Sequence, residues 1–396
     1  MAGTLDDIKV LDLSRAYAGP FCTLLLRDLG AEIIKVERKE GDTVRRDNPL
    51  TEGGESGTFI ILNRGKKSVT LDVRTTKGRE ICKQLATKVD VLVENFSPGT
   101  MEKLGLGSEV LCALNPRLIY ASISGYGHTG PKRDTVAYDP IAQAMGGMTS
   151  VTGYEDSPPI KCGVAIADFS AGLYTALAIT AAIHQRGKTG EGQTIEISLQ
   201  DCIWLFTSIE FSPPYFINGK ALPRLGSGHP AMAPGNQYMA KDGPVFICTG
   251  VLEQVHKLYR LMGRADLVDS PLGANQSERY KYKKQIDAAV EEWTSTKTMD
   301  EIIKILHDAE IPASPVPSLE QVCNDPHLYE REMIIEVEQE LSGTIKTPGS
   351  LFKMSKTPGN IRYPSPILGE HNLEVYSEML GYTEEELTQF SAEGVI

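Results

Sequence analysis

The sequence predicts an α/β protein in which a large, Rossmann-like domain with a parallel sheet is joined to a smaller α+β domain. Short apolar runs alternate with helical patterns through the first half of the chain, which is the order of a parallel sheet covered by helices on both faces. The chain has 396 residues, more than one hydrophobic core usually serves. Prolines and glycines crowd residues 213–236, as is typical of a crossing between domains.

The elements of the large domain follow from the spacing of apolar residues. Its strands share short runs rich in Val, Ile and Leu, and they are expected at residues 8–13, 33–36, 68–71, 89–93, 117–124 and 193–198. Its helices share apolar residues three or four positions apart, and they are expected at residues 21–29, 76–88 and 168–184. Since the first strands and helices alternate in β-α-β order, the strands are expected to run parallel.

The second half of the chain predicts the smaller domain and a return to the larger one. The predicted division places the large domain at residues 1–215, the small domain with its linkers at 216–330, and a returning C-terminal segment at 331–396. In the small domain a strand is expected at 244–248 and helices at 253–262, 280–295 and 300–309. An amphipathic helix at 373–380 is expected in the C-terminal segment.

Composition and charge exclude several classes of function. The chain has 41% hydrophobic and 23% charged residues, which is close to an average globular protein. Its formal net charge of -12 argues against a nucleic acid partner, because phosphate backbones are held by clustered Lys and Arg. An anionic ligand must therefore meet a local basic site. The acidic start has no signal-peptide pattern and no apolar run suits a membrane span, so a cytoplasmic protein without a membrane partner is expected.

Common catalytic and cofactor motifs fail on spacing or context. Gly125, Gly127 and Gly130 satisfy the dinucleotide pattern GxGxxG, but no helical pattern follows them, so a structured turn is favoured over a nicotinamide or flavin site. The P-loop, HExxH and GxSxG patterns are not met, and the seven cysteines form no CxxC pair. No metal and no resident cofactor are predicted. A dehydrogenase is kept only as an outside alternative, and it would require a nicotinamide to bind.

Six segments in the same order resemble the class III CoA-transferases, the formyl-CoA transferase family. They are AGP at 18–20, IKVER at 34–38, NRGKKSVTLD at 63–72, VENFSPG at 93–99, NPRLIYAS at 115–122 and ASPV at 313–316. The likeness covers essentially the whole chain. It implies an interlocked dimer whose chains each carry a nucleotide-binding-like large domain and a small domain, either as a homodimer or with a paralogous subunit.

The resemblance implies that Asp168 is the nucleophile of a covalent mechanism. Its carboxylate would attack an acyl-CoA thioester, and the reaction would pass through an aspartyl anhydride and an aspartyl-CoA thioester. From the residues alone, Asp168 is an N-cap of the following apolar helix, whose N-terminus is expected to keep the carboxylate ionised at neutral pH. The stretch 226–230 is similar to the family's glycine-rich loop, which implies catalytic roles for Gly228 and for His229, where the type member has glutamine.

The family's CoA contacts imply a binding site made from scattered positions. These are Ala16, Tyr17, Arg38, Leu71, Arg74, Asn95, Phe96, Lys103 and Tyr138. Arg38, Arg74 and Lys103 suit the phosphates of CoA, because charge-assisted contacts are stronger than neutral ones. The CoA thioester is then a substrate, and its partner is a small carboxylic acid.

Two alternatives and the substrate stay open at this point. In the related acyl-CoA racemases a histidine base stands where this chain has Tyr138, whose ordinary pKa near 10 suits a base poorly. A non-catalytic subunit of a heteromer is the other alternative, against which the presence of Asp168 argues. Succinyl-CoA is the expected donor, and the aromatic segment 206–219 favours a bulky acceptor such as benzylsuccinate over oxalate, with ordinary packing as the competing explanation.

Overall fold

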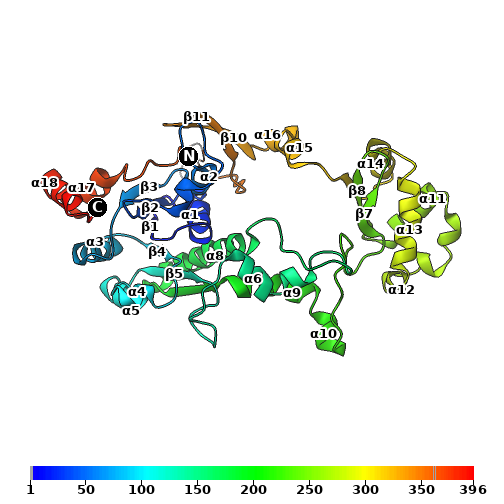
Figure 1. Ribbon diagram of the computed structural model, residues 1–396, viewed down its shortest axis with the longest axis horizontal. Coiled ribbons are helices and arrows are strands. Elements are labelled where there is room, and N and C mark those ends of the chain that lie inside the picture. The colour runs from blue at the N-terminus through cyan, green and yellow to red at the C-terminus, as the bar shows by residue number, and fades with distance from the viewer. Residues whose placement is uncertain (1–2, 360, 362) are drawn as a thin grey trace. The chain divides into compact units, whose positions relative to one another are not determined.

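The structure is a computed structural model that describes residues 3–359, 361 and 363–396. The described residues form two compact units (Figure 1). The large unit comprises the chain up to Met148, Cys162–Phe206 and Pro326–Ile396, and the small unit comprises Thr149–Lys161 and Thr207–Asp325. The boundaries thus fall at 206 and 325, where the sequence analysis placed 215 and 330, and residues 149–161 join the small unit, which the sequence analysis did not anticipate.

A parallel sheet forms the centre of the large unit, as predicted. In the part of the chain that the structure describes, its six strands lie in the order β3-β2-β1-β4-β5-β6. The strands are β1 (Lys9–Asp12), β2 (Glu32–Glu37), β3 (Lys67–Thr70), β4 (Val91–Glu94), β5 (Ile119–Ser124) and β6 (Thr194–Ser198). The direction of winding reverses between β1 and β4, and in such sheets ligands bind at the carboxyl ends of the strands near this point.

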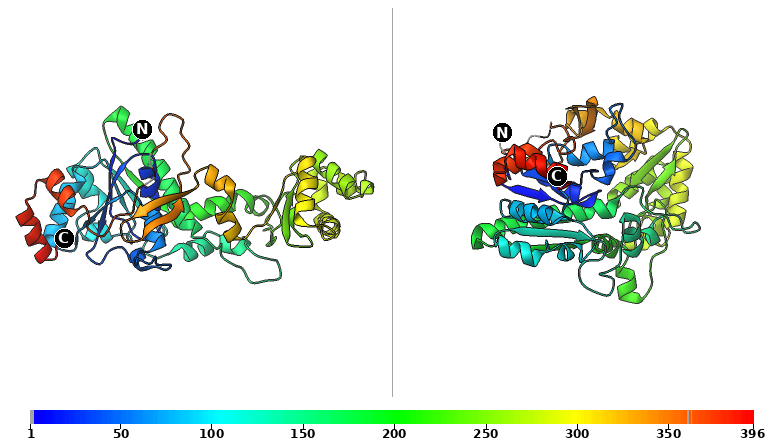
Figure 2. Two further views of the ribbon diagram at one scale, coloured as in Figure 1. Left: turned by 90° about the horizontal axis from the view of Figure 1, so that it is seen from above. Right: turned by 60° about the vertical axis from the view of Figure 1, so that its left-hand side comes forward.

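Helices cover both faces of this sheet. The helices of the large unit are α1 (Ala18–Asp28), α2 (Gly57–Asn63), α3 (Thr76–Ala86), α4 (Thr100–Lys103), α5 (Ser108–Leu114), α6 (Asp139–Met145), α8 (Ile166–Thr189), α16 (Pro326–Glu330), α17 (Asn372–Leu380) and α18 (Glu384–Ala392), with the short 3-10 helix η1 (Thr43–Arg46). One core lies between the sheet, α1 and α8, and a second core lies between the sheet, α3, α5, α17 and α18. Figure 2 shows the red C-terminal helices beside the sheet, which is why residues 331–396 belong to this unit.

Four further elements of the described chain belong wholly or partly to the large unit. Strands β10 (Ile334–Gln339) and β11 (Gly343–Pro348) pair as an antiparallel hairpin. Helices α7 (Met148–Val151) and α9 (Leu199–Glu210) begin in the large unit and end in residues of the small one.

Helix α8 is the longest of the described helices and packs closely on α1. A side chain at Gly172 would place its Cβ 2.5 Å from the carbonyl oxygen of Ala18, so only glycine permits this approach. By length and composition alone α8 could cross a membrane, a possibility that the sequence analysis did not find. Its core residues, among them Ala171 and Ile179, pack with α1 and the sheet, as in the core helix of a globular domain.

The small unit combines an antiparallel sheet with helices. Its strands are β7 (Gly235–Met239), β8 (Pro244–Cys248) and β9 (Ala313–Pro315), and its helices are α10 (Pro213–Asn218), α11 (Leu252–Leu261), α12 (Gln276–Tyr280), α13 (Lys283–Thr294), α14 (Met299–Asp308) and α15 (Leu319–Cys323), with the 3-10 turns η2 (Ala265–Leu267) and η3 (Pro271–Gly273). One core holds β7, β8, α11, α13 and α14 together. The helix predicted at 280–295 was wrong in its start, because α12 ends at Tyr280 and a new helix begins at Lys283. Helix α10 also lies in the segment that was predicted as an irregular crossing.

Candidate active site

The turn between β1 and α1 lies at the point where the winding of the sheet reverses. Its Arg15 amide donates to Asn95 Oδ1 at 2.9 Å, and Asn95 Nδ2 donates to the Arg15 carbonyl oxygen at 2.8 Å. Asn95 follows β4, so these two bonds join the loops after the two strands that flank the reversal. Ala16 has a φ of 63°, which is the left-handed region. The predicted site residues Ala16 and Asn95 therefore belong to one structural feature.

A glycine makes this turn possible. A Cβ at Gly19 would collide with the side chain of Ser14. Gly19 is the second residue of α1, and Pro20 follows it in the first helical turn, where a proline loses no intrahelical hydrogen bond. The AGP segment at 18–20 is thus explained by the close approach of helix and turn.

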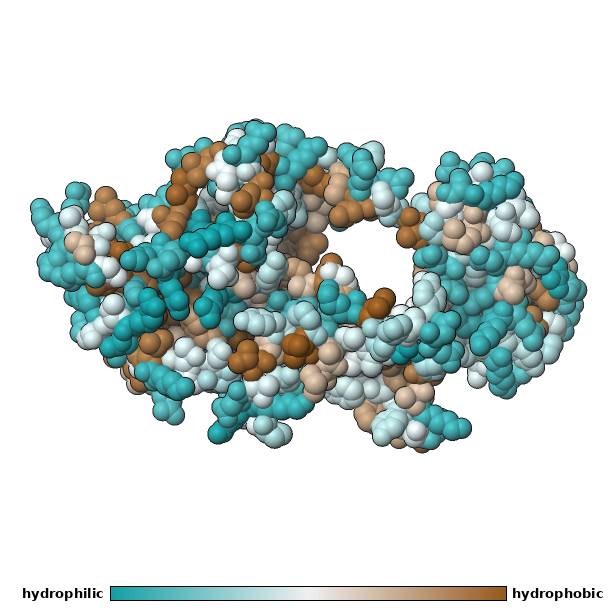
Figure 3. Space-filling view, in the orientation of Figure 1, coloured by the Kyte–Doolittle hydropathy of each residue, from teal (hydrophilic) through white to brown (hydrophobic). Residues whose placement is uncertain are grey.

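A cavity of ≈ 320 Å³ lies beside the turn. Its lining includes five predicted CoA residues, which are Arg38, Leu71, Arg74, Phe96 and Lys103. The rest of its wall is largely apolar, with Leu13, Val36, Val73, Met101 and Leu104. An apolar cavity with cations at its edge fits a flat base attached to phosphates. Figure 3 shows hydrophilic and hydrophobic residues interspersed on the visible face of the large unit.

A second cavity of ≈ 400 Å³ adjoins the first, since both share Arg15, Arg38, Arg74 and Phe96 in their walls. It also reaches Arg46 at the end of η1. The sequence analysis missed Arg15 and Arg46. The position of Arg15 directly before Ala16 was the available signal, whereas nothing in the sequence places Arg46 near this edge of the sheet.

Two of these cations already have aromatic or acidic neighbours. The guanidinium of Arg15 lies 5.3 Å from the centre of the Phe96 ring. Arg74 binds Asp72 through two hydrogen bonds of 2.8 and 2.7 Å, and these contacts hold the pKa of Asp72 below its ordinary value. Both arginines stay exposed, so they can turn toward an anionic ligand at little cost.

Asp168 is the third residue of α8 and not its N-cap, which corrects the sequence analysis. Asp139 of α6 supplies the cap from outside, because its Oδ1 accepts the Ala167 amide at 2.8 Å. Helix α8 therefore begins at Ile166, before the predicted start. The neighbouring Phe169 packs on two aromatic rings, at 6.1 Å from Tyr17 and 5.1 Å from Phe21. Asp168 is thereby placed next to the start of α1.

The protonation of Asp168 also differs from the expectation. Burial, together with the negative charge of Asp139, raises the pKa of Asp168 to about 7. The expectation that the helix N-terminus keeps this carboxylate fully ionised at neutral pH was therefore wrong. Among the described residues no lysine or arginine forms an ion pair with Asp168, so no cation lowers its pKa. A carboxyl group with a pKa near 7 is a candidate for covalent or acid-base chemistry.

Of the other predicted residues, one precedes α6 in the large unit and two lie in the small unit. Tyr138 precedes α6 and is 75% exposed. Gly228 and His229 lie in the small unit, so the structure does not bring them into one unit with Asp168. His229 Nδ1 accepts the Ala231 amide at 2.9 Å, which leaves Nε2 as the donor of a neutral ring.

The glycine loop is anchored by a residue that the sequence analysis missed. Gly226 has a φ of 60°, and a Cβ there would lie 2.5 Å from the Tyr154 ring. Tyr154 belongs to the 149–161 segment, which explains why that segment joins the small unit. No local signal predicts this contact.

The GxGxxG segment forms a turn, as predicted. After Gly130 the backbone makes further turns, and the next helix begins only at Asp139. Gly127 has a φ of 83°, and a Cβ there would lie 2.5 Å from a carboxylate oxygen of Glu196. The segment therefore has no helix N-terminus for a pyrophosphate.

The model of the family described as CoA-transferase family III matches residues 5–372 of the chain. The chain belongs to CoA-transferase family III. This confirms the family resemblance and the enzyme class predicted from the six sequence segments.

Named relatives of this CoA-transferase align over almost its whole length. It is 37% identical to a protein of Chloroflexus aurantiacus named succinyl-CoA--D-citramalate CoA-transferase, over 99% of this chain and 98% of that protein. It is 36% identical to the succinyl-CoA:mesaconate CoA-transferase of Haloarcula hispanica, over 95% and 96% of the two chains. The crystal structure of a CAIB/BAIF family protein from Brucella suis matches with a TM-score of 0.84 and 36% identity, and it covers 96% of this chain and 100% of that one.

Proposed function

We propose that this CoA-transferase moves CoA from succinyl-CoA to a small dicarboxylic acid, with Asp168 as the covalent nucleophile. The observation that carries the proposal is the position of Asp168, a carboxyl group with a pKa of about 7 whose neighbour Phe169 packs on Tyr17. The turn that holds Tyr17 borders a cavity with apolar walls and a cationic edge. A nucleophile and a fitting site for CoA are thereby combined in one unit.

The proposed reaction exchanges acyl groups without net hydrolysis. The Asp168 carboxylate attacks the thioester carbon of succinyl-CoA, which gives a mixed anhydride and the CoA thiolate. The thiolate attacks the aspartyl carbonyl carbon, and succinate leaves with one oxygen of Asp168. The acceptor carboxylate then attacks the aspartyl-CoA thioester and releases the thiolate again. Finally the thiolate attacks the acceptor carbonyl carbon, which forms the new thioester and frees the carboxylate of Asp168.

Binding of CoA is proposed to use the two adjoining cavities. The adenine ring would lie against Leu71 and Phe96, and the phosphates would meet Arg38, Arg74 and Lys103. Arg15 lines both cavities and is a further candidate for a phosphate contact. This arrangement solves the problem that an acidic chain faces with a polyanionic substrate, because the cations gather at one place.

The choice of acceptor follows from the relatives. Those named for D-citramalate and mesaconate act on small dicarboxylic acids, as does a succinyl-CoA--L-malate CoA-transferase beta subunit that is 35% identical. We therefore favour an acid of this size over benzylsuccinate, which the aromatic segment 206–219 had suggested. The beta-subunit relative also keeps a heteromer open. Leu173 and Leu177 of α8 are 49% and 63% exposed, and a partner chain, identical or paralogous, would cover them.

The test is a transfer assay with a panel of acceptors. Purified protein is incubated with succinyl-CoA and with citramalate, mesaconate, malate, glutarate, oxalate or benzylsuccinate, and new thioesters are identified by mass spectrometry. A new thioester of a small dicarboxylic acid that is lost in Asp168→Asn supports the proposal. Solvent deuterium entering a 2-methylacyl-CoA in place of any transfer would instead establish the racemase alternative.

A further inference from the structure

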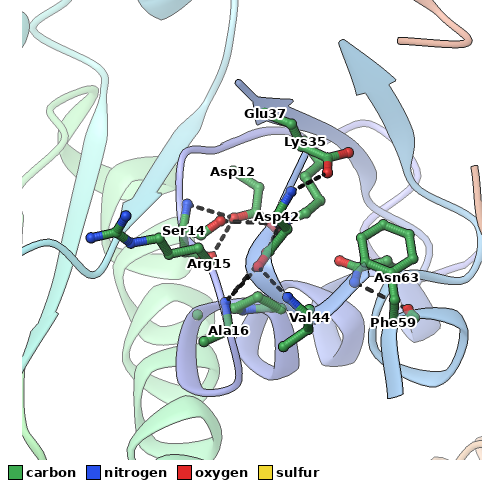
Figure 4. A network of polar contacts seen from close by, with 12 residues as sticks. Asp12, Ser14, Arg15, Ala16, Lys35, Glu37, Asp42, Val44, Phe59 and Asn63 are labelled. Atoms are coloured by element: carbon green, nitrogen blue, oxygen red, sulfur yellow. Dashed lines mark hydrogen bonds and ion pairs between the residues drawn. The ribbon is translucent and has the colours of Figure 1, made fainter. Parts of the chain in front are cut away.

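The turn before α1 is held almost entirely by side chains. Five consecutive main-chain polar groups, from the Ser14 amide to the Ala16 amide, each bond to a side chain. Figure 4 shows Asp12 and Asp42 beside this turn. The partners are Asp12 for Ser14 N–H, Lys35 for Ser14 C=O, Asn95 for both groups of Arg15, and Asp42 for Ala16 N–H. A loop of this kind has no secondary structure of its own to fix it, so these side chains determine its shape.

The first support is a buried pair between the end of β1 and the start of β3. Asp12 accepts the Ser14 amide at 3.0 Å and also its hydroxyl group. Lys66 Nζ lies 3.2 Å from Asp12 and donates to Pro20 O, Thr23 Oγ1 and Asn63 Oδ1 at 3.0, 2.8 and 2.9 Å. Both charged side chains are fully buried. Lys66 therefore ties the turn to the first turns of α1 and to the end of α2.

The second support is a buried pair that reaches the cavity wall. Lys35 Nζ donates to Asp42 Oδ2 at 2.9 Å and to the Ser14 carbonyl oxygen at 3.0 Å. Asp42 in turn accepts the Ala16 amide at 3.2 Å, and its own amide donates to Glu37 at 2.9 Å. Lys35 and Asp42 line the larger cavity. This pair therefore connects the turn with the loop that carries Arg46.

Buried ion pairs are a poor way to stabilise a fold, since apolar residues of equal volume usually do so as well or better. Their strength lies in fixing one conformation, and here that conformation includes the left-handed Ala16. The charges also balance, because two lysines face two aspartates. We propose that Asp12, Lys35, Asp42 and Lys66 are positioning residues that hold the Ser14–Ala16 backbone in the shape that binds the CoA thioester. This inference rests on the proposed function, in which that turn borders the CoA site.

The protonation of Lys66 provides a second test of this inference, through the pH dependence of the KM for succinyl-CoA. Burial lowers the pKa of Lys66 to about 8, helped by the charge of Lys35 and opposed by Asp12 and Asp42. The other titratable groups of the network are Glu37, which pairs with Arg45, and the buried thiol of Cys22, whose strongly raised pKa keeps it neutral. Lys66 thus loses its proton as the pH rises above 8, and Asp12 loses its charge partner. The KM for succinyl-CoA should then rise above pH 8, while the KM for the acceptor does not.

The test removes one pair in a charge-balanced way. The double variant Lys35→Met/Asp42→Ala frees the Ser14 carbonyl and the Ala16 amide, and it should raise the KM for succinyl-CoA about tenfold with kcat within twofold. Asp42→Asn is near-isosteric and serves if the double variant does not fold, with an expected rise of about threefold. The matched control is Arg64→Met/Asp28→Ala, which removes another buried pair of the large unit that has no bond to the turn. It should leave this KM unchanged.

The outcomes separate this inference from the proposed function. A folded Lys35→Met/Asp42→Ala or Asp42→Asn protein with the wild-type KM for succinyl-CoA overturns the inference, and so does a control that raises KM equally. If the wild type binds CoA in calorimetry but transfers none, the proposed reaction is wrong and the same variants are compared by their Kd for CoA. A wild type that binds no CoA overturns both.

Discussion

Two aspartates of the large unit behave in opposite ways. Asp12 is fully buried, which alone would raise its pKa, yet Lys66, Lys35 and the hydroxyl groups of Ser14 and Thr23 hold the pKa of Asp12 below its ordinary value. Asp168 is less buried, and its pKa rises to about 7 through burial and the nearby Asp139. Burial raises the pKa of both carboxyl groups, and only Asp12 has neighbouring cations that reverse this effect.

The difference in pKa between Asp12 and Asp168 fits the different roles proposed for the two residues. A carboxylate that holds a backbone turn must stay ionised to accept two hydrogen bonds, and Asp12 receives cations for that purpose. A carboxylate that attacks a thioester must be reactive, and a cation bound to it would lower its basicity. Asp168 has an acidic neighbour instead. Variants that remove either neighbour test whether this comparison holds.

The largest expected effect is on the nucleophile itself. Asp168→Asn removes the attacking oxygen and should lower the rate of CoA transfer by at least about 1,000-fold. Because the variant also removes a costly charge, its melting temperature at pH 8 should equal or exceed that of the wild type. A folded Asp168→Asn protein whose rate of CoA transfer is within tenfold of the wild-type rate would contradict the proposal that Asp168 is the covalent nucleophile.

The next effect is on stability and concerns Asp12. Lys66→Met leaves the buried carboxylate without its cation and should lower the free energy of unfolding by about 3–5 kcal/mol. Adding Asp12→Asn removes the orphaned charge and should recover most of that loss. Urea unfolding of the single and double variants measures both. Equal losses in the two would mean that charge pairing is not what Lys66 contributes.

A smaller effect is expected at the edge of the cavity. Arg74→Ala should raise the KM for succinyl-CoA about tenfold, which corresponds to about 1.4 kcal/mol of binding, and the effect should shrink at high salt. Arg264→Ala is the matched control, because Arg264 is equally an exposed arginine paired with an aspartate two residues away, in the small unit. A similar rise in the control would remove Arg74 from the binding site.

The smallest effect is a shift along the pH axis. Asp139→Asn removes the charge that raises the pKa of Asp168, while its Oδ1 can still accept the Ala167 amide. We expect kcat of the wild type to rise with pH near 7, as Asp168 loses its proton, and this rise should move to lower pH in the variant. Asp134→Asn, at an exposed carboxylate in the loop before α6, should not move it. An unchanged limb in Asp139→Asn would mean that burial alone raises the pKa.

The free energy of unfolding should also depend on the protonation of Asp168. The unfolded chain releases it near pH 3.8, whereas the folded chain holds it until about pH 7. The folded state therefore binds more protons in this window, and the contribution of Asp168 to stability falls as the pH rises from about 4 to 7. Asp168→Asn should flatten the pH dependence of the melting temperature in that range.

Local patterns predicted the sheet well. Alternating apolar runs were sufficient for the parallel strands, and family segments led to Arg38, Arg74 and Phe96 in one cavity wall. The start of α8 was predicted late, because Asp139 caps it from a separate helix. Such a cap depends on a tertiary contact, so the sequence near residue 166 contains no signal that predicts it.

The buried network could not be predicted from the sequence either. Lys35 stands inside an apolar strand and Lys66 in a run of basic residues, and both patterns usually mean exposed charge. Their partners, Asp42 and Asp12, are paired with them only by the fold. The raised pKa of Asp168 has the same origin, since it depends on which side chains surround it.

The central claim, that Asp168 carries the acyl group, is tested most directly with oxygen. The enzyme is incubated in ordinary water with succinyl-CoA and an acceptor acid whose carboxylate oxygens are ¹⁸O. The mass of the peptide that contains Asp168 is then measured by mass spectrometry. The account predicts a gain of about 2 Da, and about 4 Da after many turnovers, because each cycle leaves one acceptor oxygen on the aspartate. Product formation with no label on that peptide would contradict it.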